Sequence, residues 1–258
     1  GNYMTSIDMN GASVSLLAVD DELKDYLDAK ANTPALKLDG SPALPFEFAT
    51  KDATAEYNAN TAVETAAEHA EIQNEQFTIE NMRYVVDVMA ACIIKNEVPF
   101  CELDAHAGDG DFGMSVAKGF KQLKREWQSL IQAPHMDEFL LNSSMIIMEH
   151  CGGASGPIWG SAFRAASKAI QGKQTLSVAY FAEMLQAAVK GIQVTGERSF
   201  GRGAVVGDKT LIDALVPCAD SWSANTDKTF KENFKEKNAQ ENSVDQVLNL
   251  WTPDLHSL

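Results

Sequence analysis

The sequence predicts an all-α protein, built as an antiparallel helical bundle or barrel and preceded by a short α/β segment. From Phe77 onward, apolar residues recur at intervals of three and four, which is the period of amphipathic helices. Short glycine-rich turns separate these stretches, as expected between antiparallel helices of a bundle. The 258 residues are 45% hydrophobic, which is enough for one large domain or two small ones with a core.

The N-terminal part predicts a strand and a short helix. Residues 12–19 alternate and then become continuously apolar, which is typical of a strand. Residues 20–30 carry acids in their first turn and place Leu23, Tyr26 and Leu27 on one face, which favours a short helix. The chain then becomes rich in Ala, Thr, Asn and Glu and contains several prolines, which is typical of a linker. We expect three regions: the α/β segment at 1–38, the linker at 39–76 with a helix-compatible stretch at 61–72, and the helical domain at 77–258.

The helical domain contains six predicted helices. The first has Thr78 as its N-cap, and the second follows an aspartate-rich turn. The fourth begins at Pro157, and the sixth has Asp208 as its N-cap and is bent or ended at Pro217. The polar segment after Trp222 predicts one frayed helix. The first, third and fifth helices are expected at 78–98, 136–150 and 177–194. The buried face of the first helix is expected to consist of Met82, Val85, Val86, Met89 and Ile93. That of the second helix is expected to consist of Val116, Phe120, Leu123, Trp127 and Leu130.

The chain is strongly acidic, with a formal net charge of −15. Such a field repels nucleic acid and anionic membrane surfaces, so we expect neither as a partner. Any phosphate must be reached through a metal ion or backbone N–H groups. No run approaches about 18 apolar residues and no basic segment precedes an apolar one, so we expect no transmembrane helix or signal peptide and a cytoplasmic location. Because the first residue is Gly1, we expect a piece of a longer chain.

The four cysteines are not spaced as a metal site. No Cys-x-x-Cys pair occurs, and no histidine lies at zinc-ligand spacing from them. We expect buried free thiols in a reducing compartment at Cys92, Cys101, Cys151 and Cys218.

The segment DAHAGDGDFG, residues 104–113, combines three aspartates with three glycines. Because Asp is short, the carboxylates of Asp104, Asp109 and Asp111 converge only if the backbone folds tightly, which the glycines permit. Converging carboxylates suit a hard divalent cation such as Mg²⁺, and the spacing excludes an EF-hand loop. The alternative is a solvated Asp-Gly turn that binds nothing.

Two further glycine-rich turns open helices. CGGASGPIWG, residues 151–160, offers backbone N–H groups for an anion, unless it is a plain helix-ending turn. FGRGAVVGDKTLIDAL, residues 200–215, is not a P-loop, because Asp208 separates Gly207 from Lys209 and no strand precedes it. It is either a phosphate-side loop with Lys209 nearby or an ordinary capped helix with a solvated lysine. Together the three turns have the parts of a magnesium–nucleotide site.

At these residues the sequence resembles the nucleotide-binding L domain of dihydroxyacetone kinases. The segments LDAHAGDGDFG, GGASGPIWG and GDKTLIDAL are similar to its three signatures, in order and at similar separations, over about residues 77–222. Residues 1–29 resemble the end of the K domain, which binds dihydroxyacetone. A K-domain end, a linker and an L domain on one chain imply the fused, ATP-dependent type of kinase.

The resemblance implies an eight-helix barrel with the nucleotide capping one end. It implies that Asp104, Asp109 and Asp111 hold two Mg²⁺ ions that bridge the phosphates of ATP or ADP, and that Gly203 and Leu211 lie near the adenine. It also implies a K domain carrying dihydroxyacetone as partner, a homodimer when intact, and no catalytic side chain on this chain. The residues implied along the phosphates are Phe112, Gly113, Met114, Ser115, Ala154 and Ser155.

The sequence departs from the family pattern at three places. Phe112 stands where many members have a histidine, so any contact of that side chain is lost. The K-domain histidine that forms a hemiaminal with dihydroxyacetone is not in this sequence. Segments that contribute an Arg and an Asp to the nucleotide site are not found, and after Trp222 we expect the last two barrel helices to be missing or replaced.

We therefore interpret the chain as the nucleotide-binding part of an ATP-dependent dihydroxyacetone (glycerone) kinase of glycerol metabolism, inactive on its own. Three alternatives stay open. They are a non-catalytic ADP-binding subunit or sensor, a truncated remnant that folds poorly and binds nothing, and the cyclising lyase activity on flavin nucleotides found in some animal members.

Overall fold

The computed structural model describes residues 18–32, 37–38, 61–106, 108–201, 203–208 and 210–234. The chain divides into two compact units, Gly1–Lys51 and Asp52–Leu258, each with its own secondary structure. The strand predicted at residues 12–19 lies outside the described residues except for Ala18 and Val19, which have no regular structure.

The first unit contains the predicted short helix and a strand pair. Helix α1 (Asp21–Asp28) begins after Asp20, whose carboxylate accepts a hydrogen bond from the backbone N–H of Leu23 at 2.8 Å. Strands β1 (Ala31–Asn32) and β2 (Lys37–Leu38) pair antiparallel. This matches the small α/β segment expected here, although the predicted apolar face of α1 is exposed.

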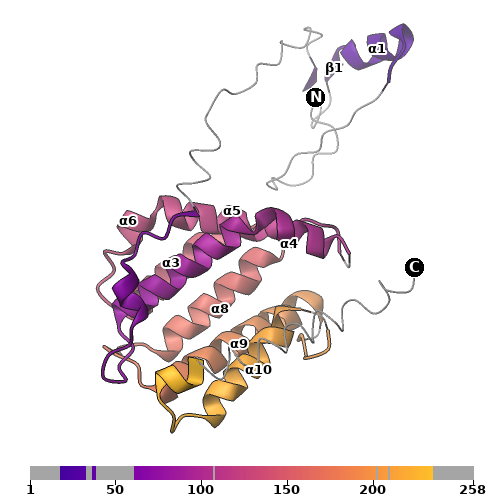
Figure 1. Ribbon diagram of the computed structural model, residues 1–258. Helices are drawn as coiled ribbons and strands as arrows, with labels where there is room; N and C mark the ends of the chain where they lie inside the picture. Colours follow the sequence, from indigo (N-terminus) through magenta and orange to yellow (C-terminus); the bar gives the residue numbers. More distant parts are fainter. Residues whose placement is uncertain are drawn as a thin grey trace, which may run out of the picture. The chain divides into compact units, whose positions relative to one another are not determined.

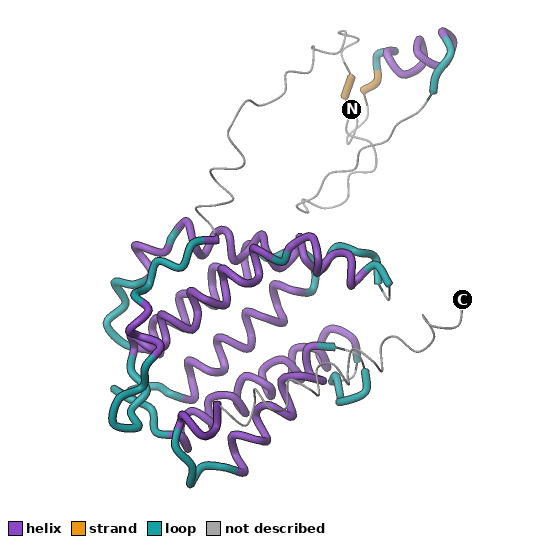
Figure 2. The backbone as a smooth tube through the Cα atoms, in the orientation of Figure 1, coloured by secondary structure: helices purple, strands orange, loops and turns teal. Residues whose placement is uncertain are grey.

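The second unit is helical, which confirms the all-α prediction. Figure 2 shows its helices joined by short connections, and residues 230–234 form a further helical turn at the end of the described chain. None of the described helices is long and apolar enough to cross a membrane. The elements are the 3-10 helix η1 (Ala67–Ala70) and the α-helices α3 (Ile79–Lys95), α4 (Glu97–Asp104), α5 (Phe112–Arg125), α6 (Trp127–Leu130), α7 (Met136–His150), α8 (Ser155–Ala169), α9 (Val178–Phe200) and α10 (Leu211–Ala224).

The long helices pack in the order α3, α5, α7, α8, α9 and α10, with α4 against α5. Short connections join successive helices, so neighbours run in opposite directions. The α4–α5, α7–α8 and α9–α10 connections therefore lie at one end of the bundle, as Figure 1 shows for α4, α5 and the α9–α10 connection. We name this end the turn end, because it contains all three glycine-rich turns of the sequence.

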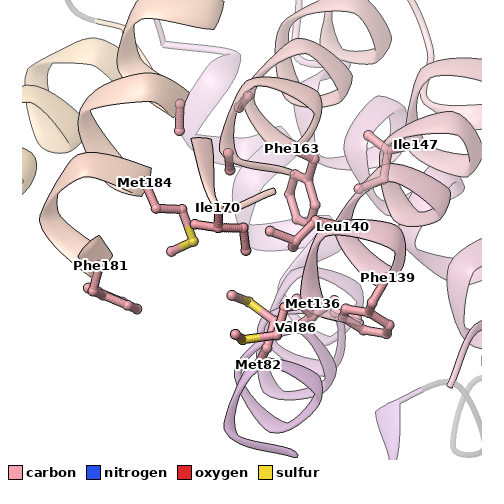
Figure 3. Close-up of a cluster of buried hydrophobic side chains, with 14 of the residues drawn as sticks. Met82, Val86, Met136, Phe139, Leu140, Ile147, Phe163, Ile170, Phe181 and Met184 are labelled. Atoms are coloured by element: carbon pink, nitrogen blue, oxygen red, sulfur yellow. The ribbon is translucent and has the colours of Figure 1, made fainter. Parts of the chain in front are cut away.

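The core lies between the helices, and Figure 3 shows part of it, including Met82, Phe139 and Phe163. All five apolar residues predicted on the second helix are at most 4% exposed. On α3 the prediction fails at Val85, which is 42% exposed, whereas Val86 is buried. The side chains of neighbouring residues on a helix point about 100° apart, so Val85 and Val86 do not both point toward α5. Val85 instead lines an apolar pocket.

Aromatic side chains close the end of the bundle opposite the turn end. The ring centroids of Phe77 and Phe181 lie 5.0 Å apart, and those of Phe181 and Trp222 lie 4.7 Å apart. Phe230 packs 6.0 Å from Phe77, and its backbone N–H donates to the Glu75 carboxylate at 2.7 Å. Residues just before α3 and just after α10 therefore meet in one cluster.

A buried ion pair holds the segment before α3 against the helices. Lys124 of α5 and Asp87 of α3 have side chains 1% and 0% exposed, and their Nζ and Oδ1 atoms lie 2.6 Å apart. The Glu64 carboxylate lies 3.0 Å from the same ammonium. The other Asp87 oxygen accepts hydrogen bonds from the backbone N–H groups of Glu64 and Thr65 and from the Thr65 hydroxyl. Residues 64 and 65, inside the expected linker, are thus held against α3 and α5.

Several element boundaries differ from the prediction. Helix α4 was not predicted, and within residues 62–72 the structure has only the short helix η1. Helix α8 begins at Ser155, two residues before Pro157, and α9 continues six residues past the predicted end at 194. These differences lengthen the helices that flank the turn end.

The predicted N-cap of α10 was wrong. The cap is Thr210, whose hydroxyl accepts the backbone N–H of Ile212 at 3.3 Å, while the Asp213 carboxylate accepts the Thr210 N–H at 2.8 Å. Asp208 lies two residues earlier, inside the connection rather than at the first turn. The helix also continues through Pro217 to its end, so this proline does not terminate it.

The four cysteines are free, as predicted, but only Cys151 is buried. Burial raises the pKa of the Cys151 thiol from 9.0 to about 11. Cys101 and Cys218 are half-buried, and Cys92 is exposed, so the prediction of burial was wrong for these three. The reason for Cys92 is its place on α3, on the face that lines the apolar pocket.

Candidate functional site

The acidic turn between α4 and α5 brings its three aspartates together. Asp104 is the last residue of α4, and Asp111 is the N-cap of α5. One carboxylate oxygen each of Asp104, Asp109 and Asp111 lies within 4.8 Å of those of the other two. Asp104 is half-buried and the other two are exposed. The tight folding expected from the sequence is therefore present.

Two glycines make this convergence possible. A Cβ atom at Gly108 would lie 2.5 Å from Asp104 Oδ1, so a larger residue would displace that carboxylate. Gly110 has a φ of +77°, a conformation that residues with a side chain rarely adopt. The other oxygen of Asp104 accepts the backbone N–H of Phe112 at 3.2 Å, which fixes the turn to the start of α5.

The acidic turn has the charge and the donor atoms for a divalent cation. In the part of the chain that the structure describes, no ion pair involves Asp104, Asp109 or Asp111. Three hard oxygen donors close together, with no ion-pair partner among the described residues, fit Mg²⁺, which is usually bound by a few carboxylates and keeps other positions for water or phosphate. The N-terminus of α5 lies beside them and favours an anion.

The first backbone N–H groups of α5, expected along the phosphates, are largely hydrogen-bonded within the chain. Phe112 N–H donates to Asp104, and Ser115 N–H donates to the Asp111 carbonyl at 2.9 Å. Met114 N–H donates to the Cys101 Sγ atom at 3.2 Å. Sulfur is a weak acceptor. Of these three N–H groups, the Met114 N–H would therefore lose the least when a phosphate oxygen replaces its present acceptor.

The second glycine-rich turn lies against the first. Gly152 N–H donates to the Ser115 carbonyl at 3.0 Å, and a Cβ at Gly152 would lie 2.8 Å from Ser115 Oγ. This close approach sets Ala154, the N-cap of α8, and Ser155, its first residue, beside the first turn of α5. The N-termini of α5 and α8 therefore lie next to each other.

The third turn, between α9 and α10, lies at the same end of the bundle (Figure 1). A Cβ at Gly203 would lie 3.3 Å from the carbonyl oxygen of Gln193 on α9, so the turn runs close over that helix. Leu211, the first residue of α10, packs on the edge of the core. Lys209, considered as a phosphate partner, lies outside the described residues.

An apolar pocket beside the acidic turn was not predicted. Its volume is about 490 Å³, and it lies between α3, α4, α5 and α8. Phe112 contributes to its wall, with its ring 6.1 Å from that of Phe100. The side chain at position 112, where the resemblance led us to expect a histidine in many members, is thus part of this wall. The sequence signal that could have indicated this pocket is a second row of apolar residues on α3, formed by Val85, Val88 and Cys92.

Comparison with known families identifies the family to which the chain belongs. The model of the DAK2 domain family matches residues 106–248, and that of the Dak1 domain matches residues 1–35. The chain therefore belongs to the DAK2 domain family, and it carries Dak1 and DAK2 sequence together. This confirms the resemblance to the dihydroxyacetone kinases.

Curated relatives include fused kinases and separate subunits. The chain is 27% identical to the L-erythrulose 1-kinase of Mycolicibacterium smegmatis over 86% of its own length, and 26% identical to the triokinase/FMN cyclase of Rattus norvegicus over 87%. It is 33% identical over 55% of its length to the ADP-binding subunit DhaL of the PTS-dependent dihydroxyacetone kinase of Lactococcus lactis. The aligned part is 36% of each of the first two proteins and 67% of the third, so the chain spans about a third of the fused kinases.

Proposed function

We propose that this chain is the nucleotide-binding part of an ATP-dependent kinase that phosphorylates dihydroxyacetone or a related small ketose. The observation that carries the proposal is the convergence of Asp104, Asp109 and Asp111 within 4.8 Å at the start of α5. Three carboxylates that converge and lack an ion-pair partner in the described structure suit a divalent cation, and the dipole of a helix start favours an anion beside it. A cation beside an anion is the signature of a magnesium–nucleotide ligand.

In this proposal Asp104, Asp109 and Asp111 would hold Mg²⁺, which neutralises phosphate charge when it is bound. The chain's own groups position the ligand. Asp104 keeps one oxygen on the Phe112 N–H, and this bond fixes the direction of its other oxygen. Met114 N–H exchanges its sulfur acceptor for a phosphate oxygen. The N-terminus of α8, at Ser155, adds a second positive helix end.

The phosphoryl acceptor is proposed to sit on a Dak1-type domain, in the same or a separate chain. The match of residues 1–35 to that domain and the names of the kinase relatives support this. We propose regions 1–38, 39–76 and 77–258 as K-domain end, linker and L domain, and a homodimer for the intact protein. On its own the L domain is expected to bind nucleotide without phosphorylating ketose.

A second candidate function is that of a non-catalytic subunit that keeps ADP bound. It is favoured by the similarity to subunits that are named ADP-binding. The two functions differ in nucleotide exchange. A kinase releases ADP and takes up ATP in each cycle, whereas a subunit that uses ADP as a cofactor retains it when ATP is added.

Calorimetric titration with ADP tests the proposal. We expect binding in Mg²⁺, no binding in EDTA, and loss of binding in Asp109→Ala. Asp220→Ala is the matched control, because Asp220 is an exposed carboxylate of α10 outside the acidic turn, where it accepts a hydrogen bond from Gln186 of α9 at 2.8 Å. Equal binding with and without Mg²⁺, or full binding by Asp109→Ala, would overturn the proposal.

A further inference from the structure

Helix α7 carries an exposed apolar row that the candidate site does not use. The row consists of Leu141, Met145 and Met148, all of which are exposed. Because these residues are four and three positions apart, they share one side of the helix, away from its buried residues. Single exposed apolar residues are ordinary, whereas a contiguous row with a charged rim is typical of a contact surface.

The apolar row borders α8. A Cβ atom at Gly160 of α8 would lie 2.8 Å from Met148 Cβ and 3.2 Å from the Ser144 carbonyl oxygen. Since glycine has no side chain, α8 approaches α7 closely at this level. The exposed side chains of the two helices therefore form one continuous surface, with the apolar row at its centre.

Charged residues flank the apolar row, with opposite signs on its two sides. Glu138 and Glu149 are exposed on α7, and the step of about 100° per helical residue places them on the side of the row away from α8. Arg164 and Lys168 are exposed on α8, four and eight residues after Gly160. In the part of the chain that the structure describes, no ion pair involves any of these four charged residues. The surface therefore changes from negative through apolar to positive.

Two of these charges lie at the same level along the antiparallel helices. Gly160 is level with the turn of α7 between Ser144 and Met148. Lys168 is eight residues after Gly160, and Glu138 is eight residues before the middle of that turn. Both helices rise by about 1.5 Å per residue, so Glu138 and Lys168 lie level with each other, on opposite sides of the apolar row.

We propose that this surface binds the same surface of a second copy of the chain. A two-fold axis parallel to the helices lays α7 of one copy over α8 of the other and brings the two apolar rows together. Glu138 of each copy then faces Lys168 of the other copy at the same level. The opposite signs of the flanking charges make the surface complementary to itself, which favours a second copy over a partner with one sign of charge.

This inference deepens the homodimer proposed above by giving it a contact surface, and it does not depend on nucleotide binding. The surface lies on α7 and α8 and contains none of the aspartates of the acidic turn. A variant that breaks the dimer should therefore bind Mg-ADP like the wild type, so the dimer surface and the nucleotide site are tested separately.

Analytical ultracentrifugation of the 258-residue chain tests the proposal. We expect the wild type to show a reversible monomer–dimer equilibrium. Met145→Glu places a charge at the centre of the apolar row and should raise the dissociation constant at least about 100-fold. Val98→Glu is the matched control, because Val98 of α4 is 65% exposed and Met145 is 62% exposed. This control should dimerise like the wild type.

Charge reversal tests the orientation of the two copies. Glu138→Lys and Lys168→Glu each place like charges opposite one another, so each should weaken the dimer by about tenfold. The double variant restores opposite charges at both contacts and should return to within about threefold of the wild type.

Thermal unfolding of each variant should match that of the wild type, since all the changed side chains are exposed. A wild type that stays monomeric at about 100 μM overturns the inference. So does a folded Met145→Glu variant that dimerises like the wild type, or a double variant that dimerises no better than the single ones. A wild type that dimerises but binds no Mg-ADP overturns the proposed nucleotide site and supports the dimer surface alone.

Discussion

Two groups of carboxylates in this chain have opposite surroundings. Asp87 is completely buried and bonded to Lys124, and it also receives three hydrogen bonds from residues 64 and 65. The aspartates of the acidic turn lie within 4.8 Å of one another, and none has an ion-pair partner in the described structure. The first carboxylate is neutralised by the chain, whereas the second group has no cationic partner among the described residues.

The difference shows how to separate a structural charge from a functional one. A buried carboxylate is tolerated when a cation and hydrogen bonds compensate it, so removal of either Asp87 or Lys124 alone would leave an uncompensated buried charge. The exposed carboxylates of Asp109 and Asp111 repel each other and have no ion-pair partner in the described structure, so we expect them to contribute little to folding. Glycines 108 and 110 nevertheless allow them to converge, which is the arrangement a metal requires.

Removing Asp87 should have the largest effect on stability. Asp87→Ala leaves the Lys124 ammonium buried without its main partner, so we expect a loss of about 3–5 kcal/mol in the free energy of unfolding. Glu64→Gln should cost less than about 1 kcal/mol, because the Glu64 side chain is 35% exposed. Urea unfolding measures both. Equal, small losses would show that the buried pair is not structural.

Removing a charge from the acidic turn should leave stability intact and weaken nucleotide binding. Asp109→Asn relieves repulsion, so in EDTA its melting temperature should equal or exceed that of the wild type. Its affinity for Mg-ADP should fall by at least about 100-fold, since loss of outer-shell partners alone costs 10–100-fold at metal sites. A variant that melts well below the wild type in EDTA would show that Asp109 stabilises the fold, as Asp87 does.

Gly108→Ala should separate the position of a carboxylate from its presence. The new Cβ would meet Asp104 Oδ1, the far end of a flexible side chain, so the carboxylate moves and the fold survives. We expect about tenfold weaker Mg-ADP binding, as for a misplaced ligand, with little change in melting temperature. Unchanged affinity would mean that Asp104 is not part of the site.

The cysteines extend the comparison to a group that is buried without a cation. Burial raises the pKa of Cys151 to about 11, so its thiol stays neutral at pH 8 and should resist alkylation there, whereas the exposed Cys92 should react. The unfolded thiol loses its proton near pH 9 while the folded one keeps it, so this group lowers stability as pH rises from 9 to 11. Mass spectrometry after labelling shows which of the two cysteines is alkylated first. Fast modification of Cys151 in the folded chain would contradict this prediction.

Much of the fold was predictable because it depends on local pattern. The apolar row from Val116 to Leu130 predicted its buried face correctly, and the end of α7 at His150 followed from the glycines after it. Helix α4 was not predictable, because it is short, contains Pro99 and has no side-chain cap bond. The choice of Thr210 over Asp208 as N-cap depends on where the chain turns, which residue type alone does not determine.

The site was predictable only in part. The repeated Asp and Gly residues of the acidic turn indicated a metal site, because glycines permit a tight turn and converging carboxylates suit a divalent cation. Asp87 and Lys124 are 37 residues apart, and only the packing of α3 on α5 brings them together. Likewise, no pattern indicated that Asp213 would accept hydrogen bonds from two backbone N–H groups of the third turn.

Metal binding at the acidic turn is the claim on which the account depends most directly. Mn²⁺ substitutes for Mg²⁺ at oxygen sites, and its free form can be followed by electron paramagnetic resonance. We predict that the wild-type chain with ADP removes Mn²⁺ from solution saturably, that Asp220→Ala does the same, and that Asp109→Asn does not. Equal Mn²⁺ uptake by Asp109→Asn and the wild type would contradict the assignment of these aspartates to a metal.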